Sequence, residues 1–314
     1  MKIVKFFFVV LITSIFICLS IFTIRFVVPR PVDYSRYLAA AIDKYRLLIQ
    51  TPSPKIIFVG GSNLAFSLDS ERVQNTLGQP VVNMGLHALL GLRYMLEEVK
   101  ENLNKGDLVV IVPEHAQFYF QLDGGMNYAV PLDTLTLFPH SIKYFTSLKQ
   151  YLRLALSMPS FIRGRKENLW KDEHDLNPNY RRSSFNKFGD AVAHLSEPPS
   201  PVLAGHLTDR SLQKYNFDSE AIPVLNKFDT YAKQRGAKAV IIFPLTAEPW
   251  FKNNEEHFRD MSAHLKKEVQ IPILRSPEEA LAPTNYFFDS VYHANGKGRE
   301  YNTASIISAL RGKL

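Results

Sequence analysis

The chain has 314 residues, a net charge of +7 and a single cysteine. One cysteine excludes a disulfide framework and cysteine-based metal sites, and we expect neither a metal nor another cofactor. The sequence also lacks the phosphate-binding loop of nucleotide hydrolases and the glycine fingerprint of dinucleotide-binding proteins. A chain of this length buries enough apolar surface to fold without disulfides or a structural metal.

The N-terminus predicts a membrane anchor. The run Phe6–Ile24 carries no charge, is rich in Phe, Ile, Leu and Val, and is long enough to cross a hydrocarbon core. Lys2 and Lys5 precede it, and such basic residues favour a cytoplasmic N-terminus. A cleaved signal peptide would have a shorter apolar region that ends in small residues, which this run does not. We therefore expect residues 1–30 to form a short cytoplasmic tail and a transmembrane anchor.

Residues 31–314 are then predicted to be an extracytoplasmic domain. They contain no cysteine. The anchor and this domain together predict a single-pass protein of the bacterial inner (cytoplasmic) membrane, with the domain in the periplasm. The membrane is contacted through the N-terminal helix, and nucleic acid is not expected as a partner of a domain outside the cytoplasm.

Strand and helix patterns alternate after the anchor. The strand candidates are short, continuous apolar runs, as in parallel strands covered on both faces. They are residues 56–59, 81–84, 108–112, 239–243 and 271–274. Helical patterns occupy residues 34–50, 69–77, 92–103, 220–234, 254–269 and 298–310. This alternation predicts an α/β fold with a three-layer, doubly wound, mostly parallel sheet.

A long segment, residues 114–218, interrupts the alternation. We interpret it as an insertion of helices and loops over the C-terminal edge of the sheet, where open α/β sheets bind ligands. Packing filler or disorder is the alternative. Within it, residues 141–187 are strongly basic. Such a patch fits anionic lipid headgroups or an acidic glycan or membrane partner, and equally an ordinary solvated surface.

Two distant motifs suggest nucleophilic chemistry. Gly60-Gly61-Ser62-Asn63 follows the first predicted strand, and its glycines permit a sharp turn that presents a serine. Asp289 and His293 lie shortly before the C-terminal helix. In a parallel sheet these segments can meet, so that His293 serves as the base for Ser62 and Asp289 orients the imidazole.

These motifs resemble the SGNH, or GDSL-like, hydrolase superfamily, in the regions of about 55–118 and 219–314. In that family the nucleophilic serine follows the first strand, and the Asp and His lie together near the C-terminus. Gly61-Ser62-Asn63 is similar to the first block, with Asn63 where Asp is commoner. The segment Asp289–His293, followed by Asn295-Gly296, is similar to the last block. The resemblance implies an SGNH or flavodoxin-like version of the predicted fold.

The resemblance also implies an oxyanion hole. Asn83-Met84-Gly85 is similar to the second block, whose backbone N–H binds the oxyanion, and either Gly85 or Ala88 aligns with the family's glycine. The third block normally adds an Asn side chain after the third strand. Here that strand is followed by Pro113, then Glu114 and His115. We expect either Glu114 or His115 to belong to the site and to contact the oxyanion or the substrate.

Two departures from the family pattern leave two hypotheses open. The third-block Asn is absent, and Asp289 and His293 are four positions apart where the family usually has three. The first hypothesis is a serine acyltransferase or carbohydrate esterase acting on O-acyl groups, with acetyl expected, of a cell-envelope polysaccharide or exopolysaccharide. The second is a catalytically silent glycan-binding or docking module.

The anchor makes the chain more similar to membrane-bound proteins of teichoic-acid D-alanylation and exopolysaccharide O-acetylation than to secreted lipases. That resemblance implies a membrane-embedded acyltransferase as partner. The sequence does not distinguish acyl transfer from hydrolysis, because both reactions use the same residues. Nor does any pattern identify the acyl group, the acceptor or the oligomeric state.

Overall fold

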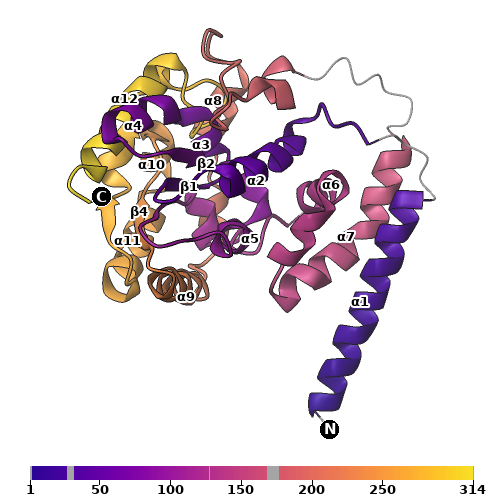
Figure 1. Ribbon diagram of the computed structural model, residues 1–314. Coiled ribbons are helices and arrows are strands. Elements are labelled where there is room, and N and C mark those ends of the chain that lie inside the picture. The colour runs from indigo at the N-terminus through magenta and orange to yellow at the C-terminus, as the bar shows by residue number, and fades with distance from the viewer. Residues whose placement is uncertain (1, 27–31, 127, 168–176, 314) are drawn as a thin grey trace.

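The computed structural model describes residues 2–26, 32–126, 128–167 and 177–313. At its centre is a five-stranded sheet in the order β2-β1-β3-β4-β6, with all strands parallel (Figure 1). The strands are β1 (Ile56–Gly60), β2 (Val81–Asn83), β3 (Leu108–Val112), β4 (Lys238–Ile242) and β6 (Ile273–Arg275). Each overlaps a predicted strand, and the predicted α/β fold with a mostly parallel sheet is confirmed. The strand order is compatible with a flavodoxin-like fold.

Helices cover both faces of this sheet (Figure 1). On one face lie α2 (Ala40–Gln50), α5 (Leu92–Lys100) and α9 (Ala221–Gln234), and on the other lie α3 (Ser62–Ser67), α4 (Ser70–Leu77) and α12 (Gly296–Leu310). The other α-helices are α1 (Lys2–Phe26), α6 (Ala129–Leu137), α7 (Leu148–Glu167), α8 (Val202–Leu207), α10 (Glu248–Asn253) and α11 (Glu255–Glu268). A second, two-stranded parallel pair, β5 (Thr246–Ala247) with β7 (Leu281–Ala282), was not predicted from the sequence.

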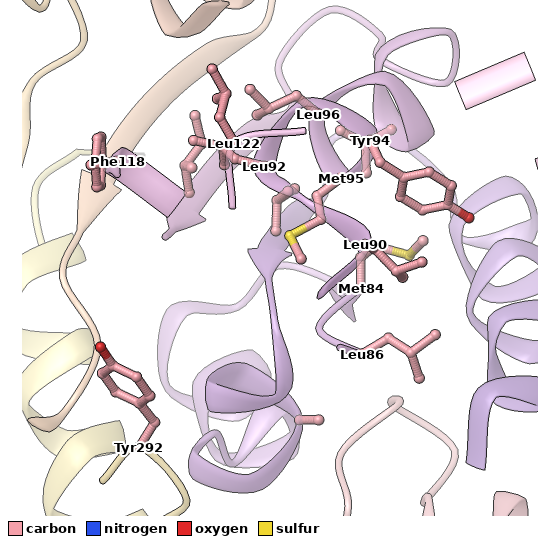
Figure 2. Close-up of a cluster of buried hydrophobic side chains, with 14 of the residues drawn as sticks. Met84, Leu86, Leu90, Leu92, Tyr94, Met95, Leu96, Phe118, Leu122 and Tyr292 are labelled. Atoms are coloured by element: carbon pink, nitrogen blue, oxygen red, sulfur yellow. The ribbon is translucent and has the colours of Figure 1, made fainter. Parts of the chain in front are cut away.

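The continuous apolar strands divide their side chains between two cores. In β1, Ile57 and Val59 belong to the larger core beneath α2, α5 and α9, whereas Ile56 and Phe58 belong to the core beneath α4 and α12. Figure 2 shows part of the larger core, in which Leu92 of α5 lies beside Leu122. Burial on both faces explains why these strands carry no polar alternation.

The strand order creates a crevice between β1 and β3. The chain goes from β1 to the edge strand β2 and returns to form β3 on the other side of β1. Connections that leave neighbouring strands in opposite directions open a crevice at the carboxyl ends of those strands. Gly60 pairs with Val112 at these two ends, so Ser62 and Glu114 emerge next to each other.

The described part of the insertion packs into the domain. Asp190 is fully buried, and its carboxylate accepts hydrogen bonds from the Ser70 hydroxyl at 2.5 Å and from the Asn83 amide at 2.8 Å. Arg299 of α12 reaches the same carboxylate at 3.2 Å. The segment around Asp190 therefore ties α4, β2 and α12 together. Residues 168–176 of the basic segment lie outside the described residues.

Helix α1 lies along α7, and Figure 1 shows its N-terminal part projecting away from the domain. The structure describes side chains for residues 8–21 of the predicted anchor, and the remainder of Phe6–Ile24 lies outside them. Ile17 and Ser20 are buried, whereas several large apolar side chains are exposed. Among the described residues, no helix has the length and apolar character needed to cross a membrane.

Candidate active site

Ser62 is held at the end of β1 by two glycines that have no room for a side chain. A Cβ on Gly60 would lie 2.6 Å from the carbonyl oxygen of Val112. A Cβ on Gly61 would lie 2.5 Å from Glu114 Oε1 and 3.0 Å from the backbone nitrogen of Ala88. Distances of 2.5 and 2.6 Å are too short for a real Cβ and 3.0 Å is tight, so glycine at both positions lets the serine turn pass close to its neighbours.

His293 and Asp289 form the pair expected from the sequence. The Nδ1 atom of His293 lies 2.7 Å from Asp289 Oδ1, which favours the tautomer whose Nδ1–H donates to the carboxylate. The imidazole also stacks on Phe66, with ring centres 4.2 Å apart and planes 11° apart. The extra residue between Asp and His therefore does not separate them, because the loop closes with a hydrogen bond from His293 N–H to the Ser290 carbonyl.

A third residue holds this pair, and it comes from the insertion. The Tyr180 hydroxyl donates a hydrogen bond of 2.5 Å to Asp289 Oδ2 and lies 3.3 Å from His293 Nδ1. Burial, and then the charge of Asp289, raise the pKa of Tyr180, so its hydroxyl stays protonated as a donor. Burial alone would raise the pKa of Asp289. The hydrogen bond from His293 and the charge of His293, together with the hydrogen bond from Tyr180, outweigh burial and hold this pKa below its ordinary value.

One cavity of about 480 Å³ brings the main candidates together. Ser62, Ala88, Glu114, Asp289 and His293 all line it. Its walls also include residues that the sequence analysis did not single out as substrate-binding, among them Tyr37, Tyr180, Val202, His206, Asp209 and Trp250. Four of these, Tyr180, Val202, His206 and Asp209, belong to the insertion, so the insertion forms part of the cavity wall.

Ala88 lines this cavity, whereas Gly85 does not. The N–H of Gly85 donates to Asn83 Oδ1 at 2.8 Å, and Gly85 itself is packed against Leu64. Among the described residues, no acceptor is found for the N–H groups of Ala88 and Ser62. Both residues line the cavity, and unpaired backbone N–H groups are the kind of donor that an oxyanion hole uses.

Glu114 and His115, although adjacent, point to different places. His115 is completely buried in an aromatic cluster with Phe243 and Phe258, and its Nδ1 lies 2.8 Å from the Tyr292 hydroxyl. Burial lowers the pKa of His115 to about 3, so the imidazole is neutral. His115 does not line the cavity, whereas Glu114 does.

Asn83 also lies in the interior. Its amide nitrogen donates to the Leu64 carbonyl at 3.1 Å and to Asp190, while its oxygen accepts from Gly85. Asn83 therefore joins the loop after β2 to α3 and to the insertion. The neighbouring His87 caps the short turn after it by accepting a hydrogen bond from Leu89 N–H at 3.2 Å. It also lines the cavity, and burial, with the charge of His293, lowers its pKa to about 4.

No local pattern in the sequence marked Tyr180, Phe66 or Tyr37 as site residues. Tyr180 follows Pro178-Asn179 in a short turn, and only the folding of the insertion brings it to Asp289. Phe66 lies in α3 directly after the nucleophile, and its position on the same helix was the only available signal. Among the described residues, no group of His, Cys, Asp and Glu side chains is arranged to hold a metal ion.

Comparison with models of known protein families gives no match for the chain, and comparison with curated protein sequences gives none either.

Proposed function

We propose that this protein is an SGNH-like serine acyltransferase or esterase that acts on O-acyl groups, with acetyl expected, of a cell-envelope polysaccharide or exopolysaccharide. One observation carries the proposal. Ser62 lines the same cavity as His293, whose Nδ1 lies 2.7 Å from Asp289 Oδ1. A serine, an oriented imidazole and free backbone N–H groups at one sheet edge are the parts that acyl transfer needs.

The chemistry follows from this arrangement. Ser62 Oγ attacks the carbonyl carbon of an ester, and its proton passes to His293 Nε2, the ring nitrogen that Asp289 leaves free. The carbonyl π electrons move to oxygen, and the N–H groups of Ser62 and Ala88 bind the resulting oxyanion. When the tetrahedral intermediate collapses, the leaving alcohol takes the proton from His293 and Ser62 remains acylated. Asp289 stabilises the imidazolium without taking its proton.

The acyl-enzyme then reacts with a sugar hydroxyl or with water. His293 takes the proton of the incoming hydroxyl, and the acyl–Ser62 bond breaks with return of a proton to Oγ. Attack by a sugar gives transfer, and attack by water gives hydrolysis. In the proposed setting, an anchor at Phe6–Ile24 holds the domain at the periplasmic face of the inner membrane, where a membrane-embedded acyltransferase supplies acyl groups. The exposed apolar side chains of α1, including Phe8, Leu11 and Leu19, support the anchor.

Covalent labelling of the full-length protein in detergent tests the proposal. A fluorophosphonate should modify Ser62 and no other residue, as located by peptide mass mapping. Ser62→Ala should abolish labelling, and His293→Ala should reduce it by about 100-fold or more, because the hydroxyl loses its base. Unlabelled wild-type protein with an intact melting transition would contradict the proposal.

A specific observation also favours the catalytically silent binding module. Among the described residues, no hydrogen bond joins Ser62 to His293, and the Ser62 side chain interacts instead with Glu114. In that case the cavity would hold a glycan, or the domain would dock onto a membrane enzyme. Binding of an acetylated polysaccharide that survives Ser62→Ala, together with absent labelling, would support this function.

A further inference from the structure

Glu114 stands in the place where the resembling family has its third oxyanion donor. Val112, the last residue of β3, pairs with Gly60, the last residue of β1. Ser62 and Glu114 each follow two residues later, on neighbouring strands of the same parallel sheet. This register brings the Glu114 side chain to the nucleophile, in the position that an Asn after the third strand would occupy.

The Glu114 carboxyl group packs onto the backbone that carries Ser62. Its Oε1 accepts a hydrogen bond of 3.3 Å from Asn63 N–H. The same oxygen lies 2.5 Å from the point where a Cβ on Gly61 would be, and the Ala88 nitrogen lies 3.0 Å from that point. The carboxyl group and the free N–H of Ala88 are therefore close neighbours beside the serine turn.

An ionised carboxylate in this place would oppose catalysis, because a developing oxyanion next to it meets a second negative charge. A neutral carboxylic acid has the opposite effect, since its O–H donates a hydrogen bond to the oxyanion. Glu114 is only 6 % exposed. Burial raises its pKa, although the charge of His293 and the hydrogen bonds from Asn63 N–H and the Ser62 side chain oppose the rise.

The other titratable groups near Glu114 are consistent with the neutral acid. Tyr37 approaches from the segment before α2, and Tyr292 from the segment that carries Asp289 and His293. Burial raises the pKa of both tyrosines, so both are neutral and neither adds a charge beside Glu114. His293 is thus the one nearby group among the described residues whose charge favours the carboxylate.

We propose that Glu114, as a neutral carboxylic acid, is the third donor of the oxyanion hole and replaces the missing Asn side chain. This inference rests on the proposed acyl-transfer function. Oε1 keeps the hydrogen bond from Asn63, and the Oε2 hydroxyl donates to the oxyanion while Ser62 and Ala88 donate their N–H groups. Glu114 keeps its proton throughout, because the transferred proton moves only between Ser62, His293 and the leaving or attacking hydroxyl.

The competing role for Glu114 is that of a base, which would accept the Ser62 proton as a carboxylate. Glutamine separates the two roles, because its amide is a neutral donor of nearly the same shape but cannot take a proton. The experiment measures hydrolysis of p-nitrophenyl acetate by the full-length protein in detergent across pH 5 to 9. The variants are Glu114→Gln, Glu114→Ala and Ser62→Ala, with Glu98→Gln as a matched control.

Glu98 is a suitable control because it is also buried but lies on α5 and does not line the cavity. We expect Glu114→Gln to keep kcat within about threefold of the wild type. In the wild type kcat should decline at high pH, because Glu114 ionises there, and the glutamine variant should not show this decline. Glu114→Ala should lower kcat by about 100-fold with little change in KM, as for loss of one oxyanion donor. Glu98→Gln should leave both constants unchanged.

Other outcomes overturn the inference. A Glu114→Gln variant that is as slow as Glu114→Ala would show that the carboxylate acts as a base. A fully active Glu114→Ala variant would show that Glu114 has no role in stabilising the oxyanion. Wild-type activity that Ser62→Ala does not reduce would overturn the proposed function itself, and the role of Glu114 with it. The melting temperature of each variant distinguishes lost chemistry from lost folding.

A second measurement does not depend on activity. The infrared carbonyl band of a protonated carboxylic acid should be present in the wild type at neutral pH and reduced in Glu114→Gln. The remaining band should disappear in the double variant with Glu98→Gln, because burial raises the pKa of Glu98 to about 8. An unchanged band in Glu114→Gln would overturn the neutral acid.

Discussion

At the scale of single residues, the candidate site depends on Tyr180, which lies 109 positions before its hydrogen-bond partner Asp289 in the chain. Tyr180 donates to Asp289, and its ring contacts Tyr37 and Phe66 at centre distances of 5.6 Å and 5.3 Å. It does not touch the reacting atoms in the proposed mechanism. In that mechanism Tyr180 would be a positioning residue, which acts on His293 through Asp289.

Replacing Tyr180 with phenylalanine should remove the hydrogen bond and keep the ring contacts. We expect kcat for ester hydrolysis to fall by about tenfold, since a hydrogen bond to a charged group contributes on the order of 1.5 to 3 kcal/mol and water replaces part of it. The pKa of Asp289 should rise without this donor, so the acid limb of the pH profile should move to higher pH.

Tyr119→Phe serves as the control for that prediction. Tyr119 is also buried, and its hydroxyl donates to the His257 carbonyl outside the cavity. A shift of the acid limb in both variants, or in neither, would contradict a positioning role for Tyr180.

At the scale of elements, the close approach of α3 to the loop after β2 sets the position of the nucleophile. Gly85 makes this approach possible, because a Cβ there would lie 2.4 Å from Leu64 Cβ and 2.8 Å from the Gly61 carbonyl oxygen. Both neighbours belong to the turn and helix that carry Ser62. Gly85 therefore matters for packing, whereas Ala88 lines the cavity.

Gly85→Ala should push α3 away from the sheet. We expect the free energy of unfolding to fall by about 2 kcal/mol, the usual cost of overpacking a tight core, and labelling of Ser62 to slow. Denaturant titration measures the first effect, and fluorophosphonate labelling measures the second. Gly205→Ala in α8 is the control, because a Cβ there meets nothing within 4 Å and alanine favours a helix. Equal stability of the two variants would contradict the packing role.

At the scale of the whole molecule, the insertion and the sheet are joined through a buried carboxylate. Asp190 connects Ser70, Asn83 and Arg299, and the same inserted segment supplies Tyr180 to the site. The insertion is thus structurally coupled to the sheet edge that carries Ser62.

Asp190→Ala should deprive the Arg299 guanidinium and the Asn83 amide of one buried acceptor each. We expect a loss of about 3 kcal/mol in the free energy of unfolding, as for breaking a buried ion pair, and faster proteolysis within residues 177–218. Asp43→Ala is the matched control, since Asp43 also binds the insertion, through Arg182 at 2.6 Å, but at the exposed surface. The control should cost less than about 1 kcal/mol. A similar cost for both variants would show that Asp190 does not hold the insertion in place.

Much of the architecture could be predicted from the sequence because its signals are local. Continuous apolar runs mark strands that are buried on both faces, and all five strands of the main sheet were found in this way. The two-residue strands β5 and β7 were missed, since so short a pair leaves no pattern. The positions of Ser62 and of the Asp289–His293 loop also follow from local order along the chain, as a serine after the first strand and a pair before the last helix.

Only the tertiary structure decided which groups reach the cavity. His115 and Glu114 are neighbours in sequence, and the direction of the chain after β3 turns one into the core and the other to Ser62. The choice between Gly85 and Ala88 depended on the Asn83 side chain, which occupies the N–H of Gly85. Tyr180 joined Asp289 only through the folding of the insertion. Sequence patterns report the environment of a segment, whereas hydrogen-bond partners are chosen among groups that meet only after the chain has folded.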